Sequence, residues 1–133
     1  MESERRVAII SERDIVVARQ KGRAMAVSLG FSLGDSTLIA TAISELARNI
    51  ITYAGEGTIA MNVIYDSRRE GLLIVASDEG PGISDIPRAL RDGFSTSGSL
   101  GIGLPGVRRL MDNFDIASEP GRGTIVTVTK WKP

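Results

Sequence analysis

Histidine and cysteine are both absent from this chain of 133 residues. Without histidine, the chain cannot build a Ser-His-Asp or Cys-His catalytic site or the usual zinc centres, and it cannot carry a phosphohistidine. Without cysteine, it cannot form a disulfide, which fits a cytoplasmic protein. Any acid–base catalysis must therefore use the side chains of Asp, Glu, Lys or Tyr.

The chain also lacks an excess of either charge and lacks a long apolar run. Its 16 basic and 16 acidic residues cancel, so the composition does not indicate binding to nucleic acid or to an anionic membrane. The apolar runs are far shorter than a membrane span, and residues 1–6 contain no apolar signal core. We therefore expect a single cytoplasmic domain over residues 1–133 that binds neither nucleic acid nor membrane.

Hydrophobic periodicity predicts an ordered series of strands and helices. Strands are expected at residues 6–10, 58–65, 72–77, 114–118 and 124–130. Helices are expected at about 11–29 and 35–53, at 86–91 within a long loop, and from Pro105 onward. Residues 72–76 are continuously apolar, which is typical of a central strand. This order favours a two-layer α/β sandwich of the α+β kind, with a mixed, mostly antiparallel sheet and helices on one face.

Glu45 and Asn49 lie four residues apart in the second predicted helix, so their side chains share one face of that helix. An Asn amide oxygen can ligate Mg²⁺ where the phosphates of a nucleotide supply negative charge. A Glu one turn earlier can accept the proton of an attacking hydroxyl or water. Taken alone, the pair is explained more simply as a solvated polar helix face.

Two glycine-containing segments follow this helix. Asp78 ends an apolar strand, where an unpaired carboxylate is costly, and the exocyclic amine of adenine is a suitable donor to it. Gly80 and Gly82 have no Cβ and let the backbone pass close to a ligand. Gly101 and Gly103 precede the last predicted helix, whose N-terminal N–H groups favour phosphate. Taken alone, each segment is explained more simply as an ordinary polar turn or glycine pair.

Thr124 opens the last predicted strand, and its hydroxyl can support Asp78 on the adenine, although Thr is also an ordinary strand residue. A P-loop is excluded because no Gly-Lys-Ser/Thr triplet is present. The glycine spacing at residues 101–106 follows a long loop, which argues against a Rossmann fingerprint. In combination, these weak signals favour a nucleotide site with Asn49 as metal ligand and Glu45 as candidate base.

These motifs resemble the Bergerat-type ATPase fold that gyrase, Hsp90, histidine kinases and MutL share. The resemblance covers nearly the whole chain. Residues 45–49 resemble its N box, 78–82 its G1 box, 101–104 its G2 box, and 123–124 its last element.

A more specific resemblance is to the RsbT-type switch kinases of the bacterial stressosome, through residues 41–50, 92–98 and 103–112. That family phosphorylates serine or threonine on STAS-domain scaffold proteins and, once released, activates a PP2C-type phosphatase. The resemblance implies a cytoplasmic kinase that uses ATP and Mg²⁺ and has STAS-domain proteins and a PP2C-type phosphatase as partners. Rival interpretations are a non-catalytic partner-switching module, an anti-sigma factor that also phosphorylates its antagonist, and a detached histidine-kinase ATPase domain.

The resemblance also implies roles for individual residues. Asn49 would hold Mg²⁺, Glu45 would be the general base, and Asp78 would select adenine. The residues that would contact the nucleotide are Gly80, Gly82, Gly101 and Gly103, with residues 92–100 as the ATP lid. Anti-sigma kinases have an Arg near the end of this lid, whereas residues 97–99 are Ser-Gly-Ser here. The terminal phosphate would then be contacted by Arg108, by Arg109, or by Mg²⁺ alone.

Overall fold

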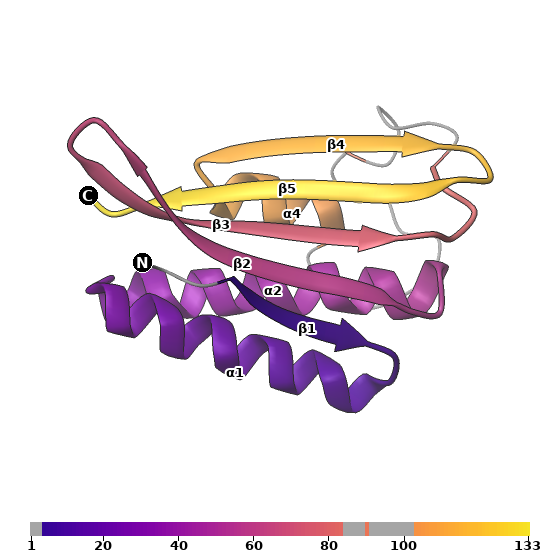
Figure 1. Ribbon diagram of the computed structural model, residues 1–133, viewed down its shortest axis with the longest axis horizontal. Coiled ribbons are helices and arrows are strands. Elements are labelled where there is room, and N and C mark those ends of the chain that lie inside the picture. The colour runs from indigo at the N-terminus through magenta and orange to yellow at the C-terminus, as the bar shows by residue number, and fades with distance from the viewer. Residues whose placement is uncertain (1–3, 84–89, 91–102) are drawn as a thin grey trace.

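A five-stranded sheet carries its helices on one face (Figure 1). This computed structural model describes residues 4–83, 90 and 103–133. The elements are β1 (Arg5–Ile9), α1 (Glu12–Leu29), α2 (Leu33–Tyr53), β2 (Gly57–Asp66), β3 (Arg69–Asp78), α4 (Gly103–Leu110), β4 (Asn113–Glu119) and β5 (Gly123–Trp131). The strands lie in the order β1-β2-β3-β5-β4. The predicted two-layer sandwich with helices on one face is therefore confirmed.

All strand pairings among the described residues are antiparallel, where a mixed, mostly antiparallel sheet was expected. The reason lies in the helices between the first two strands. Helices α1 and α2 pack side by side and run out and back, so that β2 begins beside the end of β1. The register accordingly pairs Ile9 with Gly57.

The helix ends follow from local hydrogen bonds. The Asp14 carboxylate accepts from the backbone N–H groups of Ile10 and Ser11 at 2.9 and 3.0 Å, which begins α1 and holds the pKa of Asp14 below its usual value. Gly30 ends α1 in the left-handed conformation, as predicted. Helix α2 begins earlier than predicted because the Ser32 hydroxyl accepts from the N–H of Asp35 at 3.0 Å and caps it.

The core lies between the helices and the sheet face that they cover. Strand β3 is the middle strand, as its continuous apolar run predicted. Its residues Leu72 and Ile74 are completely buried toward the helices, where Ile39 and Ile43 of α2 are equally inaccessible. The alternate β3 residues, such as Leu73, face away from the helices that the structure describes and are half-buried.

Hairpin β2–β3 extends further than the predicted strand ends. The strands continue to Asp66 and Arg69, and Ser67 adopts a positive φ of 54° in the turn between them. Arg69 explains the extension, because it forms an ion pair with Asp66 at 2.8 Å and stacks 4.1 Å above the Trp131 ring.

Helix α4 begins before Pro105, which lies in its first turn rather than at its first position. A proline is tolerated there because the first N–H groups of a helix have no intrahelical partner. The predicted helix at 86–91 falls almost entirely outside the described residues. In the part of the chain that the structure describes, no helix is both long enough and apolar enough to cross a membrane.

Two glycines of the β4–β5 turn give a first prediction. Gly121 and Gly123 both have positive φ, at 81° and 103°. A Cβ at Gly121 would meet nothing within 4 Å, whereas a Cβ at Gly123 would overlap the carbonyl oxygen of Asp78. We expect Gly121→Ala to lower the free energy of unfolding by about 1–2 kcal/mol through backbone strain. Gly123→Ala should lower it by roughly 1–3 kcal/mol more, because the β3 backbone must move.

Urea unfolding of both variants beside the unmodified protein measures this difference. Equal losses in the two variants would mean that the approach of Gly123 to Asp78 does not constrain the sheet.

Candidate active site

Glu45 is buried in α2, with only 7% of its surface exposed. A buried carboxylate is costly unless it is paired, and both of its oxygens have a donor. Oε1 accepts from Nη1 of Arg48 at 2.6 Å, and Oε2 accepts from the N–H of Gly103 at 3.3 Å. The simpler explanation of Glu45 as part of a solvated helix face is therefore wrong, and the carboxylate joins α2 to the start of α4.

Asn49 lies one turn further along α2 and is half-buried. Its amide makes no hydrogen bond to the described residues, so its oxygen is available as a ligand. Among those residues, no cluster of three or more Asp, Glu, His or Cys side chains is placed to hold a metal ion. This donor set fits Mg²⁺ that is bound largely through phosphate oxygens, with Asn49 as the ligand from the protein.

Asp78 is the last residue of β3, and the register places it between Gly57 of β2 and Thr124 of β5. Its Oδ1 accepts from the N–H of Gly80 at 2.9 Å, which closes the turn after the strand. Its second oxygen, Oδ2, has no hydrogen-bond partner among the described residues. Asp78 thus stabilises the turn through Oδ1, and Oδ2 can accept a hydrogen bond from a donor such as an amine.

Thr124 lies next to Asp78, as the sequence predicted, and its hydroxyl is oriented by Ser118. The Ser118 hydroxyl accepts from the N–H of Ile83 at 2.7 Å and donates to the carbonyl of Gly123 at 3.0 Å. Because its one proton goes to Gly123, the 2.8 Å contact between the two hydroxyls requires Thr124 to be the donor. The lone pairs of Thr124 then remain as acceptors beside the free oxygen of Asp78.

The glycines of the predicted site have different surroundings. A Cβ at Gly80 would lie 2.6 Å from the Cβ of Ala54, and one at Gly82 would overlap the carbonyl of Glu119. Both glycines therefore have a packing role, and their contact with a nucleotide stays a prediction. Among the described residues, a Cβ at Gly103 would meet only the Pro105 ring, at 3.5 Å. The predicted ligand Gly101 and the lid at 92–100 lie outside the described residues.

Helix α2 arranges these groups in a line. Ala54, which caps the helix, touches Gly80, and Glu45 lies nine residues earlier, or about 14 Å along the axis at 1.5 Å per residue. Asn49 lies between them. Asp78 and Thr124, which are suited to bind an adenine ring, are thus at one end of the line. Glu45 and the start of α4, which are suited to phosphate binding and proton transfer, are at the other end.

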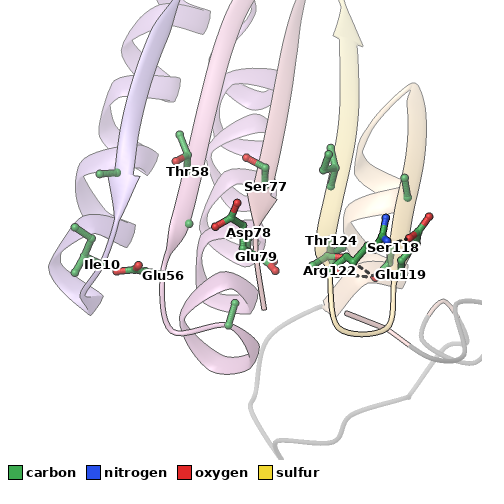
Figure 2. Close-up of a pocket in the computed structure, with 16 residues that line it drawn as sticks. Ile10, Glu56, Thr58, Ser77, Asp78, Glu79, Ser118, Glu119, Arg122 and Thr124 are labelled. Atoms are coloured by element: carbon green, nitrogen blue, oxygen red, sulfur yellow. Dashed lines mark hydrogen bonds and ion pairs between the residues drawn. The ribbon is translucent and has the colours of Figure 1, made fainter. Parts of the chain in front are cut away.

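A hollow of about 960 Å³ opens at the end of the sheet (Figure 2). Figure 2 shows Asp78 at the end of its strand, with Thr124 and Ser118 on the neighbouring hairpin. Ala54 also lines the hollow, but Glu45 does not. The hollow therefore covers only the end of the site near Asp78. The other end is defined by the hydrogen bonds of Glu45.

The sequence motifs did not indicate Arg48 or Ser118. Arg48 was detectable from its position three residues after Glu45, which brings the two side chains together on a helix. Ser118 was detectable from the hairpin, because it lies opposite Thr124. Arg108 and Arg109, the residues proposed for the terminal phosphate, are both exposed on α4.

Comparison with known proteins identifies the family. The model of the Histidine kinase-, DNA gyrase B-, and HSP90-like ATPase family matches residues 34–133. That range runs from the first turn of α2 to the end of the chain and includes every predicted site residue. The chain belongs to this ATPase family.

Individual relatives narrow the position within the ATPase family. The serine/threonine-protein kinase RsbT of Bacillus subtilis (strain 168) is 55% identical over 94% of each chain. An anti-sigma F factor of Caldanaerobacter subterraneus subsp. tengcongensis is 32% identical over 86% of this chain and 82% of its own. The predicted membership of the RsbT-type kinases is confirmed, as is the prediction of an ATP-dependent protein serine/threonine kinase.

A solved structure agrees on the fold. The mycobacterial sensor histidine kinase MprB superposes with a TM-score of 0.56 at 18% identity, and the match covers 98% of this chain and 99% of that chain. At this identity the likeness concerns the fold alone.

Asp78 gives the second prediction. In Asp78→Asn, the amide oxygen can still accept from Gly80, but an NH₂ group takes the place of the free acceptor. If this oxygen binds the adenine amine, the affinity for ATP should fall at least about tenfold, or roughly 1.4 kcal/mol.

The matched control is Asp66→Asn, which changes an exposed carboxylate at the opposite end of the same hairpin. Calorimetric titration with ATP measures both variants. Unchanged affinity in Asp78→Asn would rule out the adenine contact.

Proposed function

We propose that this kinase transfers the γ-phosphate of ATP to a serine or threonine of a STAS-domain protein. After release from that protein, it activates a PP2C-type phosphatase, and both steps take place in the cytoplasm. The observation that carries the catalytic part is the buried Glu45 carboxylate, held against the N–H of Gly103 at the start of α4. The identity to RsbT supports the choice of partners.

In this proposal, each group along α2 has its own role. Asp78 and Thr124 accept from the adenine amine, and Asn49 offers its amide oxygen to Mg²⁺. The N-terminal turn of α4, which begins at Gly103, faces the phosphates, and Glu45 takes the proton of the acceptor hydroxyl. Mg²⁺, when bound, neutralises negative charge on the phosphates. The contribution of the protein is therefore mainly the positioning of charged and polar groups.

The acceptor comes from a partner protein that presents its hydroxyl to Glu45. Because the Glu45 carboxylate lies beside the start of α4, that hydroxyl must approach close to the place where α2 and α4 meet. Recognition then depends on docking of two folded surfaces, since zero net charge offers no general attraction for a charged peptide.

A second candidate is an anti-sigma factor that phosphorylates its antagonist, which the 32% identity to an anti-sigma F factor favours. A non-catalytic module is disfavoured, because nucleotide binding alone does not require a buried carboxylate at this position. A detached histidine-kinase ATPase domain would transfer phosphate to histidine instead.

Incubation of the protein with labelled ATP and a purified STAS-domain protein tests the proposal. Label on serine or threonine of that protein supports it. Phosphohistidine would favour the detached histidine-kinase domain, and an unlabelled partner would favour the non-catalytic module. Transfer to an anti-sigma-factor antagonist, with none to a stressosome STAS protein, would favour the second candidate.

The third prediction separates nucleotide binding from phosphate transfer. Glu45→Gln removes the base but keeps the shape of the side chain, so ATP should still bind while transfer falls by about 10²–10⁴-fold. Asn49→Ala removes the proposed metal ligand, so affinity for ATP in the presence of Mg²⁺ should fall together with transfer.

Calorimetry with Mg²⁺-ATP and single-turnover labelling measure the two quantities separately. The roles of Glu45 and Asn49 would have to be abandoned if both variants lost nucleotide affinity equally.

A further inference from the structure

Two hydrogen-bond donors from different elements converge on the Glu45 carboxylate. Arg48 approaches Oε1 from within α2 at 2.6 Å, and the backbone N–H of Gly103 approaches Oε2 from α4 at 3.3 Å. The Arg48 side chain is 41% exposed and that of Glu45 is 9% exposed. Arg48 is therefore the more solvent-exposed partner of this ion pair, and Glu45 is the buried one.

This pair of donors is suited to a phosphate as well as to a carboxylate. Guanidinium groups and N-terminal helix N–H groups are the commonest partners of phosphate oxygens, and both bind a carboxylate by the same geometry. Glu45 therefore occupies a position where the protein already presents two donors to an anion. A guanidinium has five N–H groups, so Arg48 can contact a second anion without leaving the first.

Electrostatics favours a shared cation at this point. A terminal phosphate at the N-terminus of α4 must lie close to the negative charge of Glu45, which accepts from Gly103 there, and two adjacent anions repel each other. Among the described residues, Arg48 is the cation that forms an ion pair with Glu45. By contrast, Arg108 and Arg109 lie on exposed positions of α4.

We propose that Arg48 contacts the terminal phosphate of ATP and is the cation that the lid does not supply. This inference rests on the proposed role of Glu45. Arg48 reaches the phosphate through a second N–H group while it keeps its hydrogen bond to Oε1, and the remaining lone pair of that oxygen accepts the proton. The acceptor hydroxyl oxygen then forms its bond to the γ-phosphorus, its proton passes to Glu45, the bond from the γ-phosphorus to the bridging oxygen breaks, and ADP leaves.

The alternative role for Arg48 is an ordinary ion pair between neighbouring turns of a helix, which contributes little. Nucleotides of different length separate the two roles. A residue that contacts the terminal phosphate affects a triphosphate but not a diphosphate, whereas a residue that acts only on the helix affects both equally or neither.

The test is calorimetric titration of Arg48→Met and Arg48→Lys with Mg²⁺-ADP and with the non-hydrolysable triphosphate AMP-PNP. Met keeps the apolar stem of Arg48 without its charge, and Lys keeps a charge. We expect the affinity of Arg48→Met for AMP-PNP to fall about tenfold with little change for ADP, and Arg48→Lys to recover part of the loss. The matched control is Arg69→Met, which breaks an exposed ion pair of similar spacing in the β2–β3 turn.

Equal losses for both nucleotides, or no loss for either, would overturn the role of Arg48. The same titrations in a Glu45→Gln background check that Arg48 acts on the phosphate directly, because the preference for the triphosphate should then still depend on Arg48. Loss of that dependence would reduce Arg48 to a positioning residue for Glu45. An unmodified protein that bound neither nucleotide would instead refute the proposed function itself.

Discussion

The Glu45 carboxylate, buried between two helices, is the interaction on which the rest of the site depends. Its hydrogen bond to the N–H of Gly103 joins residues 58 positions apart and fixes the start of α4 against α2. A carboxylate in such a place needs both of its donors, because removing either leaves a buried charge with a single partner. The need of this buried carboxylate for two donors therefore brings the backbone N–H of Gly103 and the Arg48 guanidinium close together.

The other end of the site depends on the sheet. Antiparallel register aligns Gly57, Asp78, Thr124 and Ser118 in one row across four strands, so that acceptors from β3 and β5 lie side by side. The Ser118 hydroxyl, with one proton to give, determines the direction of the Thr124 hydroxyl. Helix α2 connects this row to Glu45 through Ala54, which touches Gly80. The sheet register fixes the position of Asp78, and the rise of α2 fixes its separation from Glu45.

Local features of the site were predictable, and contacts between distant segments were not. The spacing of Glu45 and Asn49 placed them on one helix face because helical periodicity acts over a single turn. The burial of Glu45 could not be predicted, since it depends on α4 arriving from a distant part of the chain. Similarly, the strand β3 was identified from its apolar run, but its extension to Arg69 required the contact with Trp131. The antiparallel pairing of β1 and β2 follows from the packing of α1 against α2. Hydrophobic periodicity predicts each helix but not how the two helices are oriented to each other.

The most direct test of this arrangement is paramagnetic broadening of amide signals by Mn²⁺ bound with nucleotide in place of Mg²⁺. If the site runs along α2 as described, the Asn49 side-chain amide should broaden most, and the Gly103 amide should also broaden strongly. Signals from Ser67 and its neighbours in the β2–β3 turn should not change. Broadening centred on residues away from α2 and the start of α4, with Asn49 unaffected, would contradict the account.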